Sequence, residues 1–383
     1  MTLARFVSKN VFRNKRRSTL TALSIGFSLL LLTLMMTIWR TFYIDEGSAE
    51  SAQRIIVRNK VSLVFNVPEH YREKIRSLNG VKNVVPQQWF GGTYKDPNKD
   101  KQFAQFATDP EEFFEVYRDF HIAPEQLDAW KKDRAGCVVD SELANEHGWK
   151  IGDRIFLKGT IFPTDVELTV RGIYTAPANT LSLYFNRKYL EEAYTPLKGG
   201  VGFYGVLADS AQNVPVVAKE IDEAFRNADR ATKSESEKAF GLGWIAMLGN
   251  VKAFILSICG AVVFATLLVS ANTIAMSIRE RTREVAVLKT LGFTQRTVLG
   301  LFVGEAIGIA LVGGLLGTLA TPALIWVMAQ SPQGGFFFSN IKMTFTIAAI
   351  AMTAAAIVGF LSAFVPAYNA SRGNIVDGLR HIG

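Results

Sequence analysis

The chain has 383 residues, of which 49% are hydrophobic, and it carries 42 Lys or Arg against 34 Asp or Glu. Residues 1–44 hold seven basic residues and no acid, and residues 241–383 hold nine basic residues and four acids, so the region between them is net acidic. This excess of basic residues lies beside long apolar segments, which is typical of the cytoplasmic ends of membrane helices and argues against a nucleic-acid-binding protein. The two cysteines, Cys137 and Cys259, lie in a polar and an apolar region, so no disulfide framework is predicted.

The first segment, residues 1–18, has an apolar stripe at helical spacing flanked by Arg5, Lys9 and Arg13. This pattern predicts an interfacial helix on the inner face of a membrane, with a disordered basic tail as the alternative.

Four later segments are long and apolar enough to cross a membrane, which takes about 20 mostly apolar residues. The first of them resembles a secretory signal in position, but its apolar stretch is too long and the candidate cleavage site at residues 49–51 is too far downstream. The predicted spans are residues 19–41, 241–278, 297–330 and 341–368.

The basic residues also predict the orientation of the chain in the membrane. Six lie before the first span and five lie in the connection 279–296, whereas the connection 331–340 and its flanks hold one, at Lys342. By the positive-inside rule, the N-terminus, the connection 279–296 and the tail 369–383 are cytoplasmic. Residues 42–240 and the short loop 331–340 are then on the outer, periplasmic side.

Between the first two spans, strand and helix patterns alternate, which predicts an α+β extracytoplasmic domain. It is expected to contain two subdomains, one of them central at about 121–195. The predicted strands are 55–57, 81–85, 137–140, 152–157, 166–174 and 203–207, and the predicted helices are 69–78, 142–147 and 214–227.

No catalytic or metal site is predicted. The four histidines lack ligand spacing, and no Ser-His-Asp or paired-carboxylate arrangement stands out. The chain also lacks a Gly-x-x-x-x-Gly-Lys-Ser/Thr phosphate loop, so any ATPase activity is expected in a separate subunit, with no cofactor bound by this chain. The α+β extracytoplasmic domain is therefore expected to have a binding function rather than a catalytic one.

The most specific motif follows the second span, where residues 277–292 read Ser-Ile-Arg-Glu-Arg-Thr-Arg-Glu-Val-Ala-Val-Leu-Lys-Thr-Leu-Gly. It resembles the signature of the MacB/FtsX/LolC permease superfamily, with Thr290 where alanine is usual. The basic entry at 10–26, the segment 137–174 and the tail from Pro366 resemble other parts of that family.

The resemblance implies a cytoplasmic coupling helix over 279–296 that contacts an ABC nucleotide-binding subunit, on which ATP and Mg would be bound. Glu284→Lys or Arg281→Glu is expected to disrupt this assembly without unfolding the protein. The implied coupling residues are Arg279, Glu280, Arg281, Arg283, Glu284, Leu288, Lys289, Leu291 and Gly292.

The third span carries two pairs of glycines at four-residue spacing, which allow close helix packing. The pairs are Gly304 with Gly308 and Gly313 with Gly317. The same span contains Glu305, and an acid inside a span is a candidate functional residue, in a coupling or structural role or in proton relay.

The resemblance implies the permease of an ABC transport system in the bacterial inner membrane, present as a homodimer or a heterodimer. Export with a periplasmic adaptor and an outer-membrane duct is the leading expectation. Alternatives are a lipoprotein-releasing permease and an FtsX-like regulator of cell-wall hydrolases that transports nothing. A secondary transporter is disfavoured because inverted repeats and broken helices are missing from the sequence pattern.

Overall fold

The computed structural model describes residues 15–45, 47–96, 100, 102–177, 180–247, 249–331, 338 and 340–372. These residues form two compact units. The helical unit contains the long apolar helices, and the α+β unit consists of Asp45–Gly249 with Met328–Asn340. Most of the predicted interfacial helix at 1–18 and of the tail at 369–383 lies outside the described residues.

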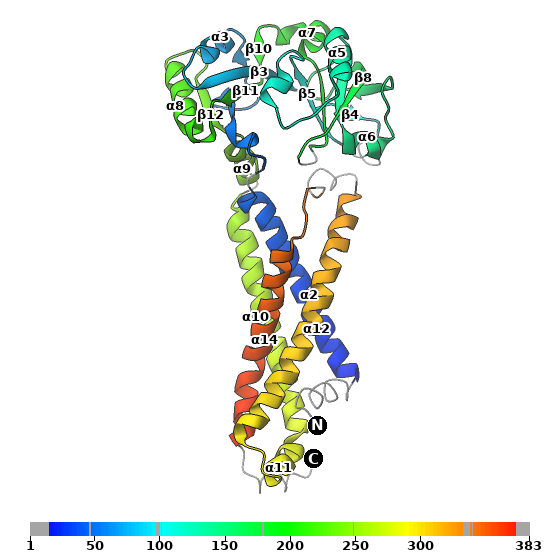
Figure 1. Ribbon diagram of the computed structural model, residues 1–383, viewed down its shortest axis with the longest axis vertical. Helices are drawn as coiled ribbons and strands as arrows, with labels where there is room; N and C mark the ends of the chain where they lie inside the picture. Colours follow the sequence, from blue (N-terminus) through cyan, green and yellow to red (C-terminus); the bar gives the residue numbers. More distant parts are fainter. Residues whose placement is uncertain are drawn as a thin grey trace. The chain divides into compact units, whose positions relative to one another are not determined.

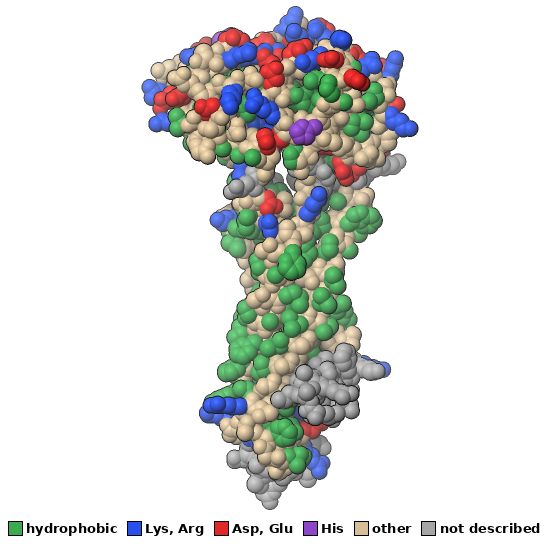
Figure 2. Space-filling model, in the orientation of Figure 1, with side chains coloured by type: hydrophobic (Ala, Val, Ile, Leu, Met, Phe, Trp, Pro, Cys, Tyr) green, Lys and Arg blue, Asp and Glu red, His purple; other side chains and the backbone are tan. Residues whose placement is uncertain are grey.

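Together the two units confirm the predicted fold class of four membrane helices plus an α+β domain (Figure 1). Four helices of the helical unit are long and apolar enough to cross a membrane, and many of their apolar side chains lie on the surface (Figure 2). The helices are α2 (Lys15–Trp39, continued by the π-helical turn η1, Arg40–Ile44), α10 (Val251–Glu280), α12 (Gln295–Ala329) and α14 (Phe345–Arg372), with the short α11 (Thr282–Thr290) between α10 and α12.

The second span begins later than its apolar composition predicts. The stretch that starts at residue 241 is divided, because Glu237–Met247 forms a separate helix, α9, that belongs to the α+β unit. Gly249 adopts a φ of +97°, and Asn250 then begins α10 by accepting a hydrogen bond from the backbone N–H of Ala253. Gly249 therefore interrupts the helix through its positive φ, and the side chain of Asn250 caps the start of the next one. Together these two residues separate α9 from α10.

The α+β unit is built on one mixed sheet of ten strands in the order β12-β1-β11-β3-β5-β9-β6-β8-β7-β4. The strands are β1 (Arg54–Asn59), β3 (Val81–Trp89), β4 (Thr93–Tyr94), β5 (Ala104–Thr108), β6 (Gly136–Asp140), β7 (Arg154–Lys158), β8 (Val166–Tyr174), β9 (Ser182–Asn186), β11 (Phe203–Ala208) and β12 (Thr232–Ser236). A separate pair is formed by β2 (Val67–Pro68) and β10 (Gly200–Val201). The two expected subdomains thus share a single sheet, joined where β5 pairs in parallel with β9.

Helices cover both faces of this sheet. On one face, α3 (Tyr71–Arg76) and α8 (Val214–Ala224) pack over β1, β3 and β11, whereas α6 (Ser141–His147) and α7 (Arg187–Ala193) pack over β6, β8 and β9. On the other face, α4 (Phe113–Val116) and α5 (Pro124–Lys132) cover residues from both halves of the sheet. This shared core, which includes Phe113, Trp130 and Tyr184, makes the two halves one body.

Candidate functional site

The predicted coupling residues lie in the connection between two long helices, at the end of α10, on the short helix α11 and at the bends on either side of α11. Arg279 and Glu280 form the last turn of α10, and Arg283, Glu284, Leu288 and Lys289 lie on α11. Arg281 stands at the bend between these helices, and Leu291 and Gly292 follow α11. The predicted helix over 279–296 is therefore a short helix with a bend at each end, and we call residues 281–293 the α11 corner.

A Schellman motif ends α11 at the glycine of the Leu-Lys-Thr-Leu-Gly segment. Gly292 adopts a φ of +91°, its N–H donates to the carbonyl of Lys289, and the N–H of Phe293 donates to the carbonyl of Leu288, both at 3.1 Å. These are the two hydrogen bonds that define the motif, which needs a left-handed residue after the helix. Gly292 thus reverses the chain into α12.

Substitution of Gly292 by alanine is expected to destabilise the α11 corner by about 1 kcal/mol, because an L side chain is disfavoured at positive φ. Amide hydrogen exchange over residues 288–296 should then accelerate about fivefold, the ratio that corresponds to that free energy. Gly300 is the matched control, since it lies inside α12 and, like Gly292, has open space around its Cβ position. Gly300→Ala should slow local exchange, and equal acceleration in both variants would contradict the explanation.

The α11 helix has a buried side and an exposed side. Val285 and Ala286 are buried, and Val285 packs with Ile278, Val298 and Phe302. On the outer side Arg283 is exposed, as are three apolar side chains at the end of the helix and the turn that follows. These are Val287, Leu291 and Phe293, with 43%, 71% and 42% of their surfaces accessible.

Arg281 and Glu305 form a buried ion pair inside the helical unit. The Nη1 of Arg281 donates to Oε2 of Glu305 at 2.7 Å, and the side chains of both residues are only 8% and 12% exposed. The coupling motif and the intramembrane acid, two separate features of the sequence, therefore form one contact that joins the α11 corner to α12. Because Arg281 is buried and paired, the expectation that Arg281→Glu leaves the fold intact no longer holds.

A small cavity lies beside Glu305. It has a volume of about 30 Å³, and its lining includes the hydroxyl-bearing residues Ser18, Thr21, Ser270, Thr273 and Ser277 as well as apolar residues such as Ile274 and Phe302. A space of this size holds about one water molecule. The Arg281 guanidinium compensates the charge of the Glu305 carboxylate within this largely apolar bundle.

The glycine pairs of α12 differ in their surroundings. Gly313 and Gly317 are buried against α2, where a Cβ on Gly317 would lie 2.5 Å from the carbonyl oxygen of Gly26. Gly304 and Gly308 are only partly buried. Two further glycines also make close contacts: Gly314 faces Ala355, and Gly359 of α14 faces Ala310.

At the membrane-linked end of the α+β unit, Arg54 holds together the two segments that lead to the membrane helices. Its guanidinium donates to Asp119 at 2.5 and 3.1 Å and to Glu237 at 2.6 Å. Asp119 also accepts a hydrogen bond from Ser48, at 2.6 Å. Ser48 follows α2 in the chain and Glu237 is the first residue of α9, which precedes α10. We call Arg54, Asp119, Glu237 and Ser48 the Arg54 junction.

Electrostatics favour the charged forms of Arg54 and Asp119 although both are buried, whereas burial raises the pKa of Glu237 above its ordinary value despite the neighbouring Arg54. Burial opposes the charge of Arg54, but the neighbouring Glu237 and Asp119 raise its pKa above the ordinary value. Burial would likewise raise the pKa of Asp119, but hydrogen bonds from Arg54 and Ser48 lower it below the ordinary value. The guanidinium also lies 4.7 Å from the ring centroid of Tyr117, a cation–π distance.

Sequence reasoning missed this junction because its members are scattered over almost 190 residues, from Ser48 to Glu237. The one available signal was an arginine at the start of the apolar strand Arg-Ile-Ile-Val.

No group of three or more His, Cys, Asp or Glu that could hold a metal ion occurs among the described residues.

Four spanning helices with an inserted α+β domain define a multi-pass membrane protein with the architecture of a permease. Residues 18–224 match the MacB-like periplasmic core domain, and residues 256–375 match the FtsX-like permease C-terminal domain. The chain belongs to the MacB/FtsX-like family of ABC transporter permeases. The second of these is a permease domain, and neither match is to an ATPase domain.

Individual relatives agree with this family. An uncharacterised ABC transporter permease, MJ1507 of Methanocaldococcus jannaschii, is 24% identical over 98% of this chain and 96% of its own length. The macrolide export ATP-binding/permease protein MacB of Brucella abortus is 24% identical over 95% of this chain but 57% of its own length. MacB of a Shewanella strain is 34% identical over 80% of the chain and 48% of the relative. The chain thus spans about half of these MacB proteins.

Solved structures similar to this chain include the periplasmic region of MacB from Actinobacillus actinomycetemcomitans, at 13% identity and a TM-score of 0.38 over 52% of this chain and 93% of that one. The extracellular domain of the ABC-type transporter YknZ matches at 13% identity and a TM-score of 0.37, over 48% and 99% of the two chains.

Proposed function

We propose that this chain is the permease subunit of an ABC transport system, and that it couples ATP hydrolysis on a separate nucleotide-binding subunit to a conformational change of its α+β domain. The observation that carries the proposal is the α11 corner. Its outer side presents Val287, Leu291 and Phe293 to solvent, beside the exposed Arg283, and its inner side is fixed to the helical unit. An exposed apolar cluster with a basic neighbour is typical of a protein-contact surface.

In this proposal the α11 corner is cytoplasmic and the α+β domain is periplasmic, at the inner membrane of a bacterium. The concentration of basic residues before the first span and in the α10–α12 connection supports this orientation. ATP and Mg would be bound by the partner, and the free energy of ATP binding and hydrolysis would bias this chain between two conformations.

A displacement of the α11 corner would be passed on by two rigid connections. The Arg281–Glu305 pair joins the corner to α12, and the continuous helix α10 extends for 30 residues from the corner. Glu237 at the start of α9 pairs with Arg54, Arg54 also pairs with Asp119, and Asp119 accepts a hydrogen bond from Ser48 in the segment after α2. The elements that respond are thus packed helices and ion pairs with defined partners, as conformational coupling requires.

Two permease copies are expected to face two nucleotide-binding subunits, as a homodimer or with a related chain. Several relatives are named as exporters, of macrolides in MacB and of pyoverdine in the Pseudomonas protein PvdT, which is 32% identical over 33% of this chain and 17% of its own length. We propose that this chain also functions in export, together with a periplasmic adaptor protein and an outer-membrane duct. Copurification that recovers the ATPase but no adaptor would refute this extension and leave the coupling proposal standing.

The double substitution Leu291→Asp and Phe293→Asp is expected to abolish recovery of the nucleotide-binding subunit on purified permease, because it places charge in the apolar contact. Copurification of the two subunits from detergent measures the outcome. Thr290→Asp is the control, since it adds a carboxylate at an exposed polar position of the same corner. Normal ATPase recovery with the double variant would refute the proposed docking surface.

A further inference from the structure

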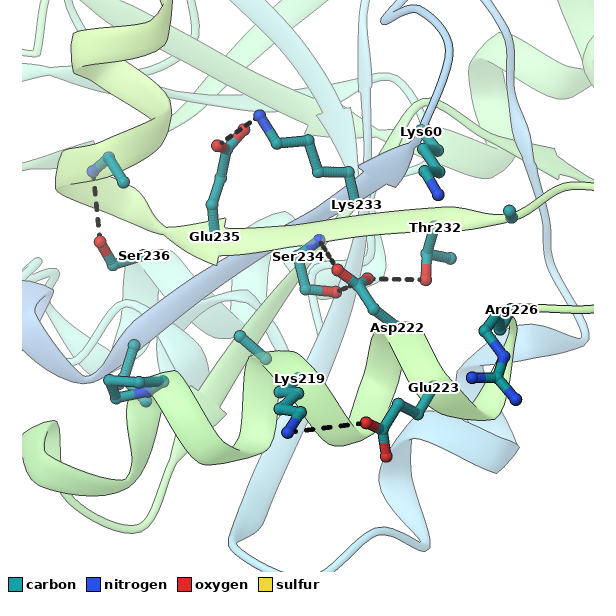
Figure 3. A pocket seen from close by; sticks show the side chains of 15 residues that line it. Lys60, Lys219, Asp222, Glu223, Arg226, Thr232, Lys233, Ser234, Glu235 and Ser236 are labelled. Carbon is teal, nitrogen blue, oxygen red and sulfur yellow. Dashed lines mark hydrogen bonds and ion pairs between the residues drawn. The ribbon is translucent and has the colours of Figure 1, made fainter.

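A groove in the α+β unit lies between helix α8 and strand β12 (Figure 3). Its volume is about 750 Å³. β12 is an edge strand of the sheet: it pairs with β1 in antiparallel register, with Ser234 opposite Val57, and its other edge has no strand partner in the described part of the chain. This second edge faces the groove, because the N–H of Ser234 points to Asp222 of α8.

Asp222 fastens the edge strand to the helix. Its carboxylate accepts hydrogen bonds from the hydroxyl of Thr232 at 2.9 Å and from the hydroxyl and the N–H of Ser234 at 2.7 and 3.1 Å (Figure 3). The groove is therefore a fixed feature of the folded unit. Three donors also compensate the charge of Asp222, so this carboxylate contributes little repulsion to an arriving anion.

The remaining charges of the groove favour an anionic ligand. Its other two carboxylates are paired, Glu223 with Lys219 at 3.8 Å and Glu235 with Lys233 at 2.9 Å. Lys60 and Arg226 also line the groove and are exposed, and neither has an acidic partner within the described residues. The charge left uncompensated is thus positive, at the end of the groove where α8 leads into β12.

An exposed apolar loop adjoins this positive end. Val61, Val64 and Phe65 are 81%, 85% and 56% exposed. The loop is held beside the groove at both ends, since the N–H of Lys60 donates to the carbonyl of Ala231 at 2.9 Å and Arg230 donates to the carbonyl of Asn66 at 2.6 Å. We call residues 61–65 the apolar loop, and large exposed apolar groups of this kind indicate a contact surface.

We propose that the α8–β12 groove binds an extended acidic segment of a partner protein, whose carboxylates pair with Lys60 and Arg226 and whose apolar side chains cover the apolar loop. The groove follows the five residues of β12, an extended length of about 17 Å, which suits a peptide and exceeds a single small anion. A flat lipid surface could meet the apolar loop and Lys60 but would not fill a groove between a helix and a strand.

This inference goes beyond the proposed coupling function, because it concerns the chemistry of a partner of the α+β unit and requires no ATPase. It can be tested on the full chain alone. Failure of the groove would leave the α11 corner unaffected, and failure of ATPase docking would leave the groove unaffected.

The test measures fluorescence anisotropy of a labelled peptide of about ten residues in which glutamate alternates with valine, a length that spans β12 and reaches the apolar loop. The full chain is held in nanodiscs of zwitterionic lipid. The double variant Lys60→Glu/Arg226→Glu is expected to bind the peptide about tenfold or more weakly, and Phe65→Ser several-fold more weakly. The control Lys132→Glu/Lys188→Glu makes the same charge change at exposed lysines of α5 and α7 and should bind normally.

Three results would overturn the proposal. The first is equal affinity for the glutamate peptide and for a lysine–valine peptide. The second is equal loss of binding in the groove variant and the control variant, which would indicate a general effect of net charge. The third is absence of peptide binding together with groove-dependent binding to phosphatidylglycerol vesicles, which would identify the surface as a membrane contact.

Discussion

Arg281→Glu is expected to destabilise the helical unit by about 3–5 kcal/mol, the usual result of removing one partner from a buried ion pair. The substitution leaves Glu305 without its cation and places a second carboxylate near it, where the side chains of both residues are almost fully buried. The thermal unfolding midpoint of the purified full chain in detergent should fall by several degrees, and the yield of folded protein should fall with it.

Two variants separate this pair from a general effect of charge reversal. Arg283→Glu makes the same change two residues further on, at an exposed side chain, and should alter stability by less than about 0.5 kcal/mol. The exchanged pair Arg281→Glu/Glu305→Arg should recover part of the lost stability. If the exchanged pair is no better than Arg281→Glu alone, the ion pair is not what joins the α11 corner to α12.

Arg54→Met is expected to destabilise the α+β unit by about 3–5 kcal/mol, because it retains much of the side-chain volume but leaves the buried Asp119 without a counter-charge. Amide hydrogen exchange in β1 and in the first turn of α9 should accelerate together, since Arg54 and Glu237 are joined in the native protein. In the proposed assembly with a nucleotide-binding subunit, ATP hydrolysis should persist while transport falls, because the substitution lies in the α+β unit and not at the α11 corner.

Arg58 provides the control for this substitution. It lies on the same strand and pairs with Glu235 at 3.1 Å, but the side chains of both residues are 15% exposed, whereas that of Asp119 is 5% exposed. Arg58→Met is expected to cost about 1 kcal/mol or less. Equal effects of the two variants would mean that the Arg54 junction has no special role, and that β1 responds to any loss of charge.

The elements that could be predicted well from the sequence are those in which apolar and polar side chains alternate or recur regularly. Val166–Tyr174 was predicted residue for residue as β8, because buried and exposed side chains alternate along it. β9 was missed because all five of its residues are buried, so it has no alternation. β12 was missed for the opposite reason: Thr-Lys-Ser-Glu-Ser carries no apolar residue, and its position is determined by pairing with β1 and by Asp222.

The candidate site shows the same contrast between features that local sequence patterns reveal and contacts that form only in the folded protein. Glu305 stood out as an acid in a span, and Arg281 stood out within a motif, since each departs from its immediate surroundings. Their contact depends on the bend at Arg281 and on the packing of α11 against α12, which local patterns do not specify. The Arg54 junction could not be found either, because it gathers residues from distant strands and linkers that resemble ordinary surface charges until the fold buries them.

The position of β1 in the sheet has a consequence for biosynthesis. β1 is the first strand of the sheet to be made, yet both of its neighbours, β11 and β12, come from the far end of the inserted domain. Neither edge of β1 can be paired until almost the whole insert has emerged from the ribosome, and closing so long a loop slows folding. The nascent domain therefore carries an unpaired apolar strand next to a helix already in the bilayer, and it is at this stage that chaperones would protect it from aggregation.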